Sequence, residues 1–265
     1  MPSPRRRLIA LPVYNEAAHL AGVLDKVVRH AEHVLVVDDG STDGSTALLA
    51  QREAERGDII LARHEKNRGY GAALCTAFAY AIEHGFEVLV TIDCDGQHEP
   101  QLIGELAQGI HSARGEVDIV SGSRYLNSHA ESTGAAPPDR RQINQTITRE
   151  LNGRLGLSLT DAFCGFKAYR VASLKELRLS ESGYAMPLEL WVQAAHHGLV
   201  IREAAVPLIY LDEERSFGGE LDKAEQRLAY YRSVIARALA AARPVDAACR
   251  ATCEAPAEAT NATSC

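Results

Sequence analysis

Two aspartates one residue apart, Asp93 and Asp95, end an apolar run in VLVTIDCDGQHEP, residues 88–100. Side chains alternate along an extended backbone, so both carboxylates can face one point in space. Divalent cations such as Mg²⁺ and Mn²⁺ take oxygen ligands and bridge to substrate phosphates. Gln97 continues the same period and could add an amide oxygen. The spacing indicates either a metal site or a solvated turn, and the position at a strand end favours the metal.

Short polar clusters also follow the other apolar runs of the first half. They are Tyr14 to Glu16 after Leu8–Val13, Asp38 and Asp39 after His33–Val37, Asp93 to His98 after Phe86–Ile92, and Ser123 and Arg124 after Val117–Ser121. Ligands bind beyond the carboxyl ends of the strands in an open α/β sheet. These clusters therefore predict one site at that edge of the sheet.

The apolar runs alternate with segments of helical periodicity. Helices are expected at 17–30, 45–56, 70–84, 99–113, 140–155, 188–197 and 221–242, and further strands at 58–62, 163–169 and 200–206. Continuous apolar strands that alternate with helices are typical of a parallel sheet covered on both faces. We therefore predict an α/β fold with a mostly parallel central sheet flanked by helices. The loop 128–139, SHAESTGAAPPD, is rich in Ser, Gly and Pro and is expected to be a mobile lid.

Several residues at the predicted edge also have a purely structural interpretation. Asp38 and Asp39 could bind a base or ribose, or could cap the next helix, although capping explains only one carboxylate. Tyr14 could stack on a base or pack in the core. The stretch 67–71 precedes a helix and could cradle phosphate or merely form the helix entry.

Three arginines and a histidine remain open in the same way. Arg124, Arg140 and Arg141 suit bidentate phosphate binding, although a lone arginine is more often a solvated surface charge. Arg124 differs from the others because it follows a strand directly. His98 could act as a base, or it could lie on the surface at a helix start.

The composition narrows the class of protein. The chain has 265 residues, a formal net charge of −7 and a pI near 5.8, which argue against a nucleic-acid partner bound by bulk electrostatics. No apolar run of the sequence approaches the roughly 20 residues needed to cross a bilayer. The six cysteines form no CxxC pair, which favours a reducing compartment over a disulfide framework or a zinc site. The basic start, Arg5–Arg7, leads to Tyr14–Glu16 rather than to a cleavage site, so we expect a cytoplasmic protein.

An ordered set of motifs carries a family resemblance: LPVYNE, VVDDGSTDGS, NRGYGAA, IDCDGQHEP, SGSRY, AFCGFKAYR and SGYAMPLELWVQAAHHG. In order and spacing they resemble the family 2 inverting glycosyltransferases, in the branch of dolichol-phosphate mannosyltransferase and related polyprenyl-phosphate glycosyltransferases. The resemblance covers about 8–219. It implies a GT-A fold with a Rossmann-like nucleotide-binding half, 1–122, and an acceptor half, 123–220. A C-terminal helix, 221–242, and a disordered tail, 243–265, are expected to follow.

The resemblance also implies roles by position. The expected nucleotide contacts are Pro12, Tyr14, Glu16, Asp38, Asp39, Asn67, Gly69 and Asp93, and the expected metal ligands are Asp93, Asp95 and Gln97. The expected acceptor or phosphate contacts are Arg140, Arg141 and Arg215. Asp95, Arg124 and Glu189 are expected to be catalytic, with Glu189 as the base if the acceptor is a hydroxyl.

We therefore expect a metal-dependent inverting transfer of a hexose, such as mannose or glucose, from a nucleoside diphosphate sugar to a polyprenyl phosphate. The cofactor would be Mg²⁺ or Mn²⁺. The alternatives are transfer to a soluble hydroxyl acceptor and a non-catalytic nucleotide-sugar-binding subunit. A nucleotidyltransferase would show a Gly-rich basic loop after the first strand, and a Rossmann dehydrogenase would show GxGxxG there. LPVYNEAAHL has neither.

The C-terminal part of the chain bears on the acceptor. In ERSFGGELDK, Glu220 and Leu221 stand where the mannosyltransferase branch usually has a Ser-Lys pair. The helix expected at 221–242 carries Leu228, Tyr231, Ile235 and Leu239 on one face, with Arg227, Arg232 and Arg237 elsewhere. Such a stripe could lie in a lipid interface, where a polyprenyl acceptor is presented, or it could pack against the sheet.

Overall fold

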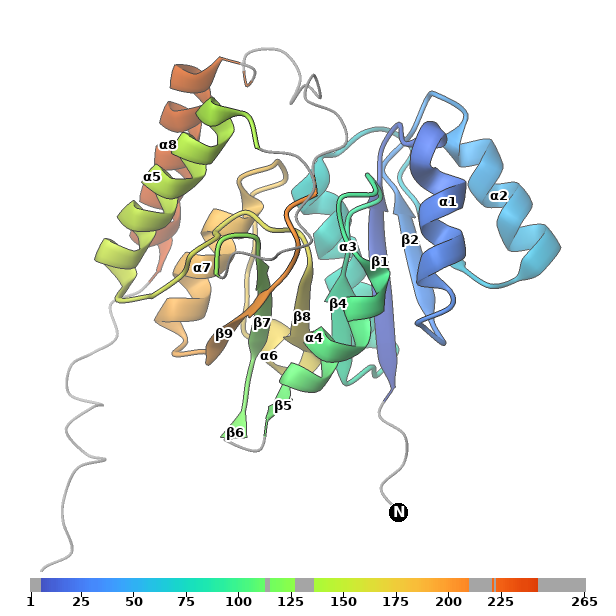
Figure 1. The fold of residues 1–265 in the computed structure, drawn as a ribbon, viewed down its shortest axis with the longest axis horizontal. Helices are drawn as coiled ribbons and strands as arrows, with labels where there is room; N and C mark the ends of the chain where they lie inside the picture. The colour runs from blue at the N-terminus through green and yellow to red at the C-terminus, as the bar shows by residue number, and fades with distance from the viewer. Residues whose placement is uncertain (1–5, 113–114, 127–135, 210–220, 222, 243–265) are drawn as a thin grey trace, which may run out of the picture.

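The computed structural model describes residues 6–112, 115–126, 136–209, 221 and 223–242, and Figure 1 shows their arrangement. Seven strands form one sheet in the order β3-β2-β1-β4-β8-β7-β9. They are β1 (Arg7–Val13), β2 (Val34–Asp38), β3 (Ile60–Arg63), β4 (Val88–Thr91), β7 (Ile119–Ser123), β8 (Lys167–Arg170) and β9 (Ile201–Ala205). Neighbouring strands are parallel except at β8, which runs antiparallel to both β4 and β7. The expected mostly parallel sheet is confirmed.

Helices cover both faces of this sheet (Figure 1). They are α1 (Ala17–Val27), α2 (Ser45–Arg56), α3 (Tyr70–Glu83), α4 (Ile103–Gly109), α5 (Pro138–Leu155), α6 (Val171–Leu174), α7 (Met186–His196) and α8 (Ala224–Ala241). Successive side chains of β1 point to opposite faces. Leu8 and Ala10 join the core formed with α3, α5, α6, α7 and α8, whereas Ile9 and Leu11 join the core formed with α1, α2 and α4. The two apolar cores explain why the strands read as continuous hydrophobic runs.

Two expected elements differ from the structure. The strand expected at 163–169 begins only at Lys167, because the chain turns at Cys164–Phe166 before it pairs with β4. The hydroxyl of Thr91 donates to the carbonyl of Gly165 at 2.7 Å and fixes this turn below the end of β4. The helix expected at 99–113 starts as a 3-10 turn at Pro100, ends at Gly109, and gives way to a short hairpin of β5 (His111–Ser112) and β6 (Gly115–Glu116).

The apolar stripe of α8 packs inward. Tyr231 and Ile235 are almost fully buried against α5 and α7, and Leu228 and Leu239 pack against the same core. The possibility that this stripe faces lipid is therefore wrong, because its apolar area is already covered by the protein. Among the helices that the structure describes, none has the length and apolar character needed to span a membrane.

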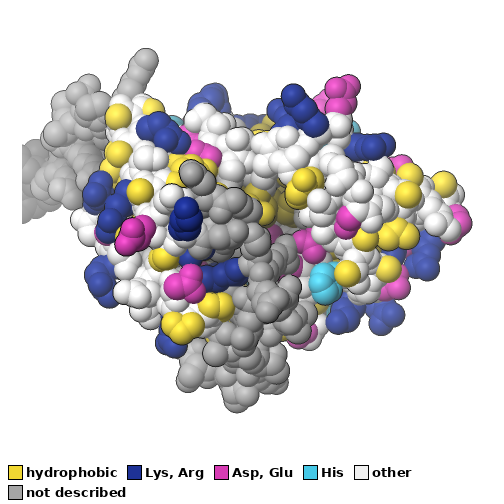
Figure 2. All heavy atoms as spheres, turned by 90° about the horizontal axis from the view of Figure 1, so that it is seen from above, with side chains coloured by type: hydrophobic (Ala, Val, Ile, Leu, Met, Phe, Trp, Pro, Cys, Tyr) yellow, Lys and Arg dark blue, Asp and Glu magenta, His cyan; other side chains and the backbone are white. Residues whose placement is uncertain are grey.

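Within the seven-stranded sheet, every strand except β8 points the same way, so the carboxyl ends of β1, β2, β4 and β7 meet at one edge. This is the edge predicted from the polar clusters. Seen from above, basic and acidic side chains are interspersed over the described surface rather than gathered into one patch of a single sign (Figure 2).

Candidate functional site

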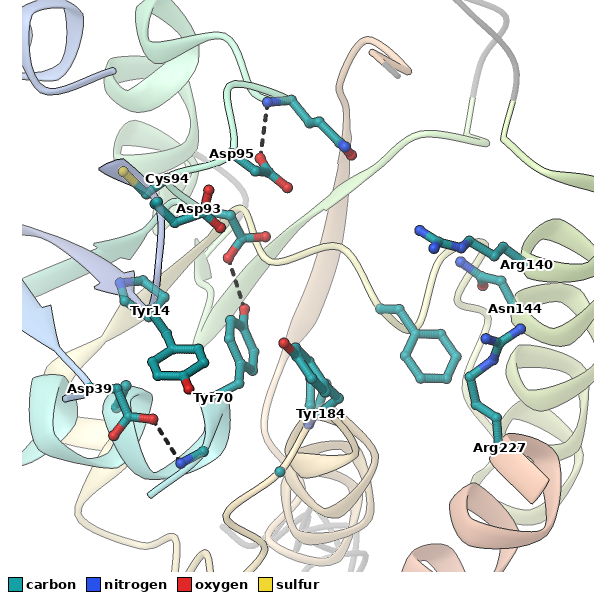
Figure 3. Close-up of a pocket in the computed structure, with 18 of the residues that line it drawn as sticks. Tyr14, Asp39, Tyr70, Asp93, Cys94, Asp95, Arg140, Asn144, Tyr184 and Arg227 are labelled. Carbon is teal, nitrogen blue, oxygen red and sulfur yellow. Dashed lines mark hydrogen bonds between the residues drawn. The ribbon is translucent and has the colours of Figure 1, made fainter. Parts of the chain in front are cut away.

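A cavity of about 420 Å³ opens at this edge of the sheet. Most of the residues predicted from the sequence line it: Pro12, Tyr14, Glu16, Asp39, Asn67, Gly69, Asp93, Asp95, Gln97, Arg124 and Arg140. The ends of β1, β2 and β4 supply one side of the cavity, and α5, α7 and α8 supply the other (Figure 3). One site therefore gathers residues from both halves of the chain.

Of the adjacent aspartates after β2, only Asp39 lines the cavity. Its carboxylate accepts backbone N–H groups of Arg68 at 2.9 Å and Gly69 at 2.7 Å. Asp38 is fully buried and accepts the backbone N–H of Ser41 and the hydroxyl of Thr46, at 2.9 and 2.5 Å. The expected nucleotide contact of Asp38 is therefore corrected: it fixes the turn into α2, since its side chain points away from the cavity.

The glycine-containing loop before α3 is shaped by close packing. Gly69 has φ of 103°, and a Cβ there would lie 2.4 Å from the carbonyl oxygen of Ser182. Only glycine fits such a contact without displacing the backbone. Tyr70 follows, and its ring stacks on that of Tyr184 at 5.8 Å between centroids. The loop therefore packs closely against residues 181–183, which link the strand-end side of the cavity to the α7 side.

Contacts from Tyr70, His98 and the turn before β8 hold the Asp93 carboxylate in place. The hydroxyl of Tyr70 donates to it at 3.0 Å, and Nε2 of His98 lies 3.4 Å from its other oxygen. Burial alone would raise the pKa of Asp93, but the His98 and Tyr70 contacts outweigh this and hold the pKa below its ordinary value. A Cβ on Gly165 would lie 2.1 Å from the Asp93 carboxylate. The turn before β8 therefore leaves Asp93 only one direction, toward the cavity.

Sequence reasoning did not find these supports of Asp93. The sequence alone is compatible with His98 as a base or as a surface residue, but its side chain is only 5% exposed and contacts the Asp93 carboxylate. Tyr70 and Gly165 stand inside the motifs NRGYGAA and AFCGFKAYR without any local sign that they converge. The motifs indicate that Tyr70 and Gly165 belong to the site. Only the folded structure shows that both contact Asp93.

The chemistry of the predicted metal ligands fits a divalent cation. Asp93, Asp95 and Gln97 all line the cavity, and the two carboxylates lie near each other on one wall (Figure 3). The backbone N–H of Gln97 donates to Asp95 at 3.0 Å and orients it. Within the described ranges, no cluster of three or more His, Cys, Asp or Glu side chains could hold a metal. Two carboxylates suit Mg²⁺ or Mn²⁺ completed by water and phosphate oxygens.

Arg124 enters the cavity already paired. Its Nε and Nη2 donate to the two oxygens of Asp161 at 2.7 and 3.0 Å. Asn144 adds a third donor to Asp161 at 2.8 Å. Burial would raise the pKa of Asp161, but the Arg124 guanidinium and these donors hold the pKa well below its ordinary value. The guanidinium is thereby fixed in one orientation at the cavity wall.

The opposite wall combines two arginines with apolar side chains. Arg140 of α5 and Arg227 of α8 lie close to Asn144 and face the aspartates across the cavity (Figure 3). Arg227 is 3% exposed, and it donates to Asp139 at 2.7 Å. The apolar residues of this wall are Ile143, Phe163, Tyr184, Pro187 and Tyr231. Burial raises the pKa of Tyr231 to about 12 even though both arginines lie near enough to oppose the shift.

Arg227 was missed as a site residue. Helical periodicity puts Arg227 outside the apolar stripe of the C-terminal helix, together with Arg232 and Arg237. The other two outer arginines do point away from the cavity: Arg232 pairs with Glu150 at 2.5 Å and Arg237 with Glu181 at 2.8 Å.

Glu189 lies away from the cavity, contrary to the expectation that it would be near the sugar or acceptor. It is 6% exposed, and its carboxylate accepts the backbone N–H groups of Ser180 and Glu181 at 2.9 and 2.7 Å. The hydroxyl of Ser180 donates to its second oxygen. The expected catalytic base is therefore corrected: Glu189 anchors the loop that carries Tyr184 to the cavity.

Of the remaining predicted residues and segments, one lies outside the cavity and the others lie wholly or mostly outside the described residues. Arg141 is exposed and does not line the cavity; its guanidinium lies 5.8 Å from the ring centroid of Tyr125. Arg215 and the tail 243–265 lie outside the described residues. So does most of the lid expected at 128–139.

Comparison with known proteins gives this geometry a context. Residues 8–178 match the family described as Glycosyl transferase family 2. The chain is 30% identical over 217 residues to polyprenol monophosphomannose synthase of Mycolicibacterium smegmatis, covering 79% of both chains. It is 31% identical over 215 residues to undecaprenyl-phosphate mannosyltransferase of Micrococcus luteus, covering 79% of this chain and 85% of that one.

A solved structure shows the same fold. Glucosyl-3-phosphoglycerate synthase from Mycobacterium tuberculosis, in complex with Mn²⁺, uridine diphosphate and glucosyl-3-phosphoglycerate, superposes with a TM-score of 0.65 at 18% identity. The match covers 90% of this chain and 81% of that one. The expected GT-A fold is confirmed. The family match over more than half of the chain, together with these relatives, shows that the chain is a glycosyltransferase belonging to glycosyl transferase family 2.

Proposed function

We propose that this enzyme transfers a hexose from a nucleoside diphosphate sugar to a polyprenyl phosphate. The observation that supports this is the division of the cavity. Asp93 and Asp95 line one wall, while Arg140 and Arg227 face them from a wall whose other side chains are mostly apolar. An anionic acceptor with a hydrocarbon chain would meet both kinds of group on that second wall. Mannose is our first candidate sugar, because two relatives carry it in their names.

The donor would lie along the strand ends. Tyr14 is 42% exposed at the cavity, so its ring is free of the core and offers a face to a base. Asp39 offers an acceptor to a base N–H or a ribose hydroxyl. Pro12, Glu16, Asn67 and Gly69 line the same side and would complete the nucleotide contacts.

The diphosphate would lie beside Asp93 and Asp95. A divalent cation held there would neutralise charge that builds up on the leaving diphosphate. Gln97 would add an oxygen, while Tyr70 and His98 keep Asp93 in place. Arg124 would assist from the adjacent wall, fixed by Asp161, where its donors need no reorganisation as charge develops.

The acceptor end favours a phosphate over a hydroxyl. A phosphate monoester is already anionic and needs no strong general base, whereas a hydroxyl requires one. The described residues that line this end, on α5, α7 and α8, include no carboxylate, and Glu189 lies away from it. Arg140 and Arg227 would bind the phosphate, and Ile143, Phe163 and Tyr231 would contact the first prenyl units.

A purified-protein assay tests the proposal. Nucleoside diphosphate sugars would be supplied one at a time with Mn²⁺ and either a polyprenyl phosphate or the matched polyprenol. We expect release of nucleoside diphosphate and a glycosylated lipid only with the phosphate, and loss of both products in excess EDTA. Equal transfer to the polyprenol or to soluble alcohols would contradict the phosphate acceptor. Donor binding without any transfer would indicate a non-catalytic subunit.

A further inference from the structure

A buried histidine supports the donor side of the cavity without lining it. His64 follows β3, and its side chain is only 6% exposed. Its Nδ1 lies 2.5 Å from the Asp39 carboxylate, and its Nε2 lies 2.9 Å from the hydroxyl of Thr76 on α3. The imidazole therefore bridges the end of the sheet and the helix behind the nucleotide-facing loop.

The backbone brings His64 to Asp39 by strand register. β2 and β3 are parallel with Asp38 opposite Arg63, so the next residues of the two strands, Asp39 and His64, also face each other. The backbone N–H of His64 donates to the carbonyl of Asp38 at 2.9 Å and continues the ladder. Neither residue can shift along the strand without breaking this pairing.

The hydrogen bonds define what His64 does for Asp39. A carboxylate only accepts, so Nδ1 of His64 is the donor in this contact. The same oxygen accepts the backbone N–H of Arg68, and the second oxygen accepts that of Gly69. The second oxygen thus keeps acceptor capacity, and Asp39 lines the cavity although it is only 2% exposed.

Thr76 holds the imidazole from the other side. Its hydroxyl also contacts the carbonyl of Ala72 one turn earlier in α3, at 3.1 Å. With both ring nitrogens occupied, the ring of His64 has one orientation. Loss of the Nδ1 donor would leave Asp39 with two backbone donors from a single loop, free to turn away from the cavity.

We propose that His64 is a positioning residue for donor recognition: it fixes Asp39 so that its free acceptor capacity meets an N–H or O–H of the nucleoside. This inference rests on the proposed function, since it requires a nucleoside diphosphate beside Asp39. His64 itself would touch no substrate. Its contribution would appear in the affinity for the nucleotide rather than in the chemical step.

Two amide substitutions separate the two ring nitrogens. In His64→Asn the side-chain amide reaches the position of Nδ1 and can still donate to Asp39. In His64→Gln the amide reaches the position of Nε2, toward Thr76. His64→Leu removes both ring nitrogens and their contacts, and Thr76→Val removes only the hydroxyl that contacts Nε2.

Affinities for UDP and GDP with Mn²⁺ would be measured by calorimetry, alongside donor KM, kcat and the thermal midpoint of each variant. We expect His64→Gln and His64→Leu to weaken nucleotide binding and raise donor KM by about 10-fold or more, the worth of one hydrogen bond to a charged group. We expect kcat of every variant to stay within about 3-fold of wild type. The nucleotide affinities of His64→Asn and Thr76→Val should also stay within about 3-fold of wild type. The Asn and Gln variants are polar and similar in size, so their comparison stands even if the Leu variant does not fold.

Two results would overturn the inference. One is equal affinity in the Asn and Gln variants, and the other is affinity that follows the thermal midpoint regardless of which nitrogen is replaced. Binding of a nucleoside diphosphate by wild type distinguishes this failure from a failure of the proposed function. If wild type binds neither nucleotide, the donor assignment itself is wrong and the role of His64 is lost with it.

Discussion

The two walls of the cavity are built in different ways. On the wall proposed to bind the donor (the donor wall), Asp39 follows β2 directly and Asp93 lies two residues beyond β4. Both carboxylates accept hydrogen bonds from the start of α3 or from the loop before it. On the opposite wall, proposed to bind the acceptor (the acceptor wall), Arg140 and Arg227 come from α5 and α8, which are far apart in the sequence. The first wall is a consequence of strand direction, and the second depends on how α5, α7 and α8 pack together.

The two walls should also differ in how much activity a substitution costs. Asp39 and Asp93 are each oriented by several hydrogen bonds. Under the proposed function, a small displacement of either would misplace a charge that has to match the nucleotide or the metal. Under the proposed function, the arginines of the acceptor wall would act on a flexible substrate through charge, with apolar side chains beside them. We therefore expect substitutions on the donor wall to cost more activity than substitutions on the acceptor wall.

The largest effect is expected from Asp95→Ala. Removing one of two carboxylates that would hold the cation takes several kcal/mol from stabilisation of the leaving group, so kcat should fall by about 10³-fold or more. The transfer assay measures this, with circular dichroism to establish that the fold is intact. Asp25→Ala is a matched control, because Asp25 pairs with Arg52 at 2.8 Å and does not line the cavity. Turnover near that of wild type in Asp95→Ala would remove the metal site from the donor wall.

Gly165→Ala should come next. The added methyl would overlap the Asp93 carboxylate, which must then move by a sizeable fraction of an ångström. Misplacement of that order costs about 10²-fold in rate. Gly104→Ala, in α4, is the control: a Cβ there meets nothing within 4 Å, so its activity should match wild type. Equal activity of the two variants would show that the position of Asp93 is not critical.

Arg227→Leu tests the acceptor wall. We expect the KM for polyprenyl phosphate to rise about 10-fold with little change in donor KM, since one charge-assisted contact to the acceptor is lost. The KM of Arg227→Lys for polyprenyl phosphate should lie between those of wild type and Arg227→Leu, because lysine keeps the charge but not the planar guanidinium group. Arg232→Leu changes the same helix outside the cavity and serves as the control. A rise in donor KM without a rise in acceptor KM would show that Arg227 contacts the donor and would contradict its assignment to the acceptor wall.

The smallest effect on turnover is expected from Glu189→Gln. A general base contributes about 10²- to 10⁴-fold, whereas a residue that anchors a loop should leave kcat within about 3-fold. The variant should instead lose thermal stability, because buried hydrogen bonds to the Glu189 carboxylate are weakened. Kinetics and a thermal scan of the same sample measure both quantities. A loss of kcat of about 10²-fold at unchanged stability would restore Glu189 as the base.

The sequence by itself determined the donor wall. Alternation of apolar runs and helical stretches fixes a parallel sheet, and parallel strands bring their carboxyl ends to one edge. Asp39, Asp93 and Asp95 follow those ends directly, so their convergence could be deduced from local pattern and strand direction alone. The family motifs then indicate sugar transfer as the reaction.

Only the tertiary structure decided which neighbours each of these residues meets. Periodicity tells whether a side chain faces the core, but not which element lies opposite it. Asp38 and Asp39 are adjacent, yet one holds a turn and the other lines the cavity. Glu189 matched a site position and faces a loop, while Arg227 looked like a surface charge and lines the acceptor wall. The place of Arg227 depends on the packing of α8 against α5 and α7, which brings together residues far apart in the sequence.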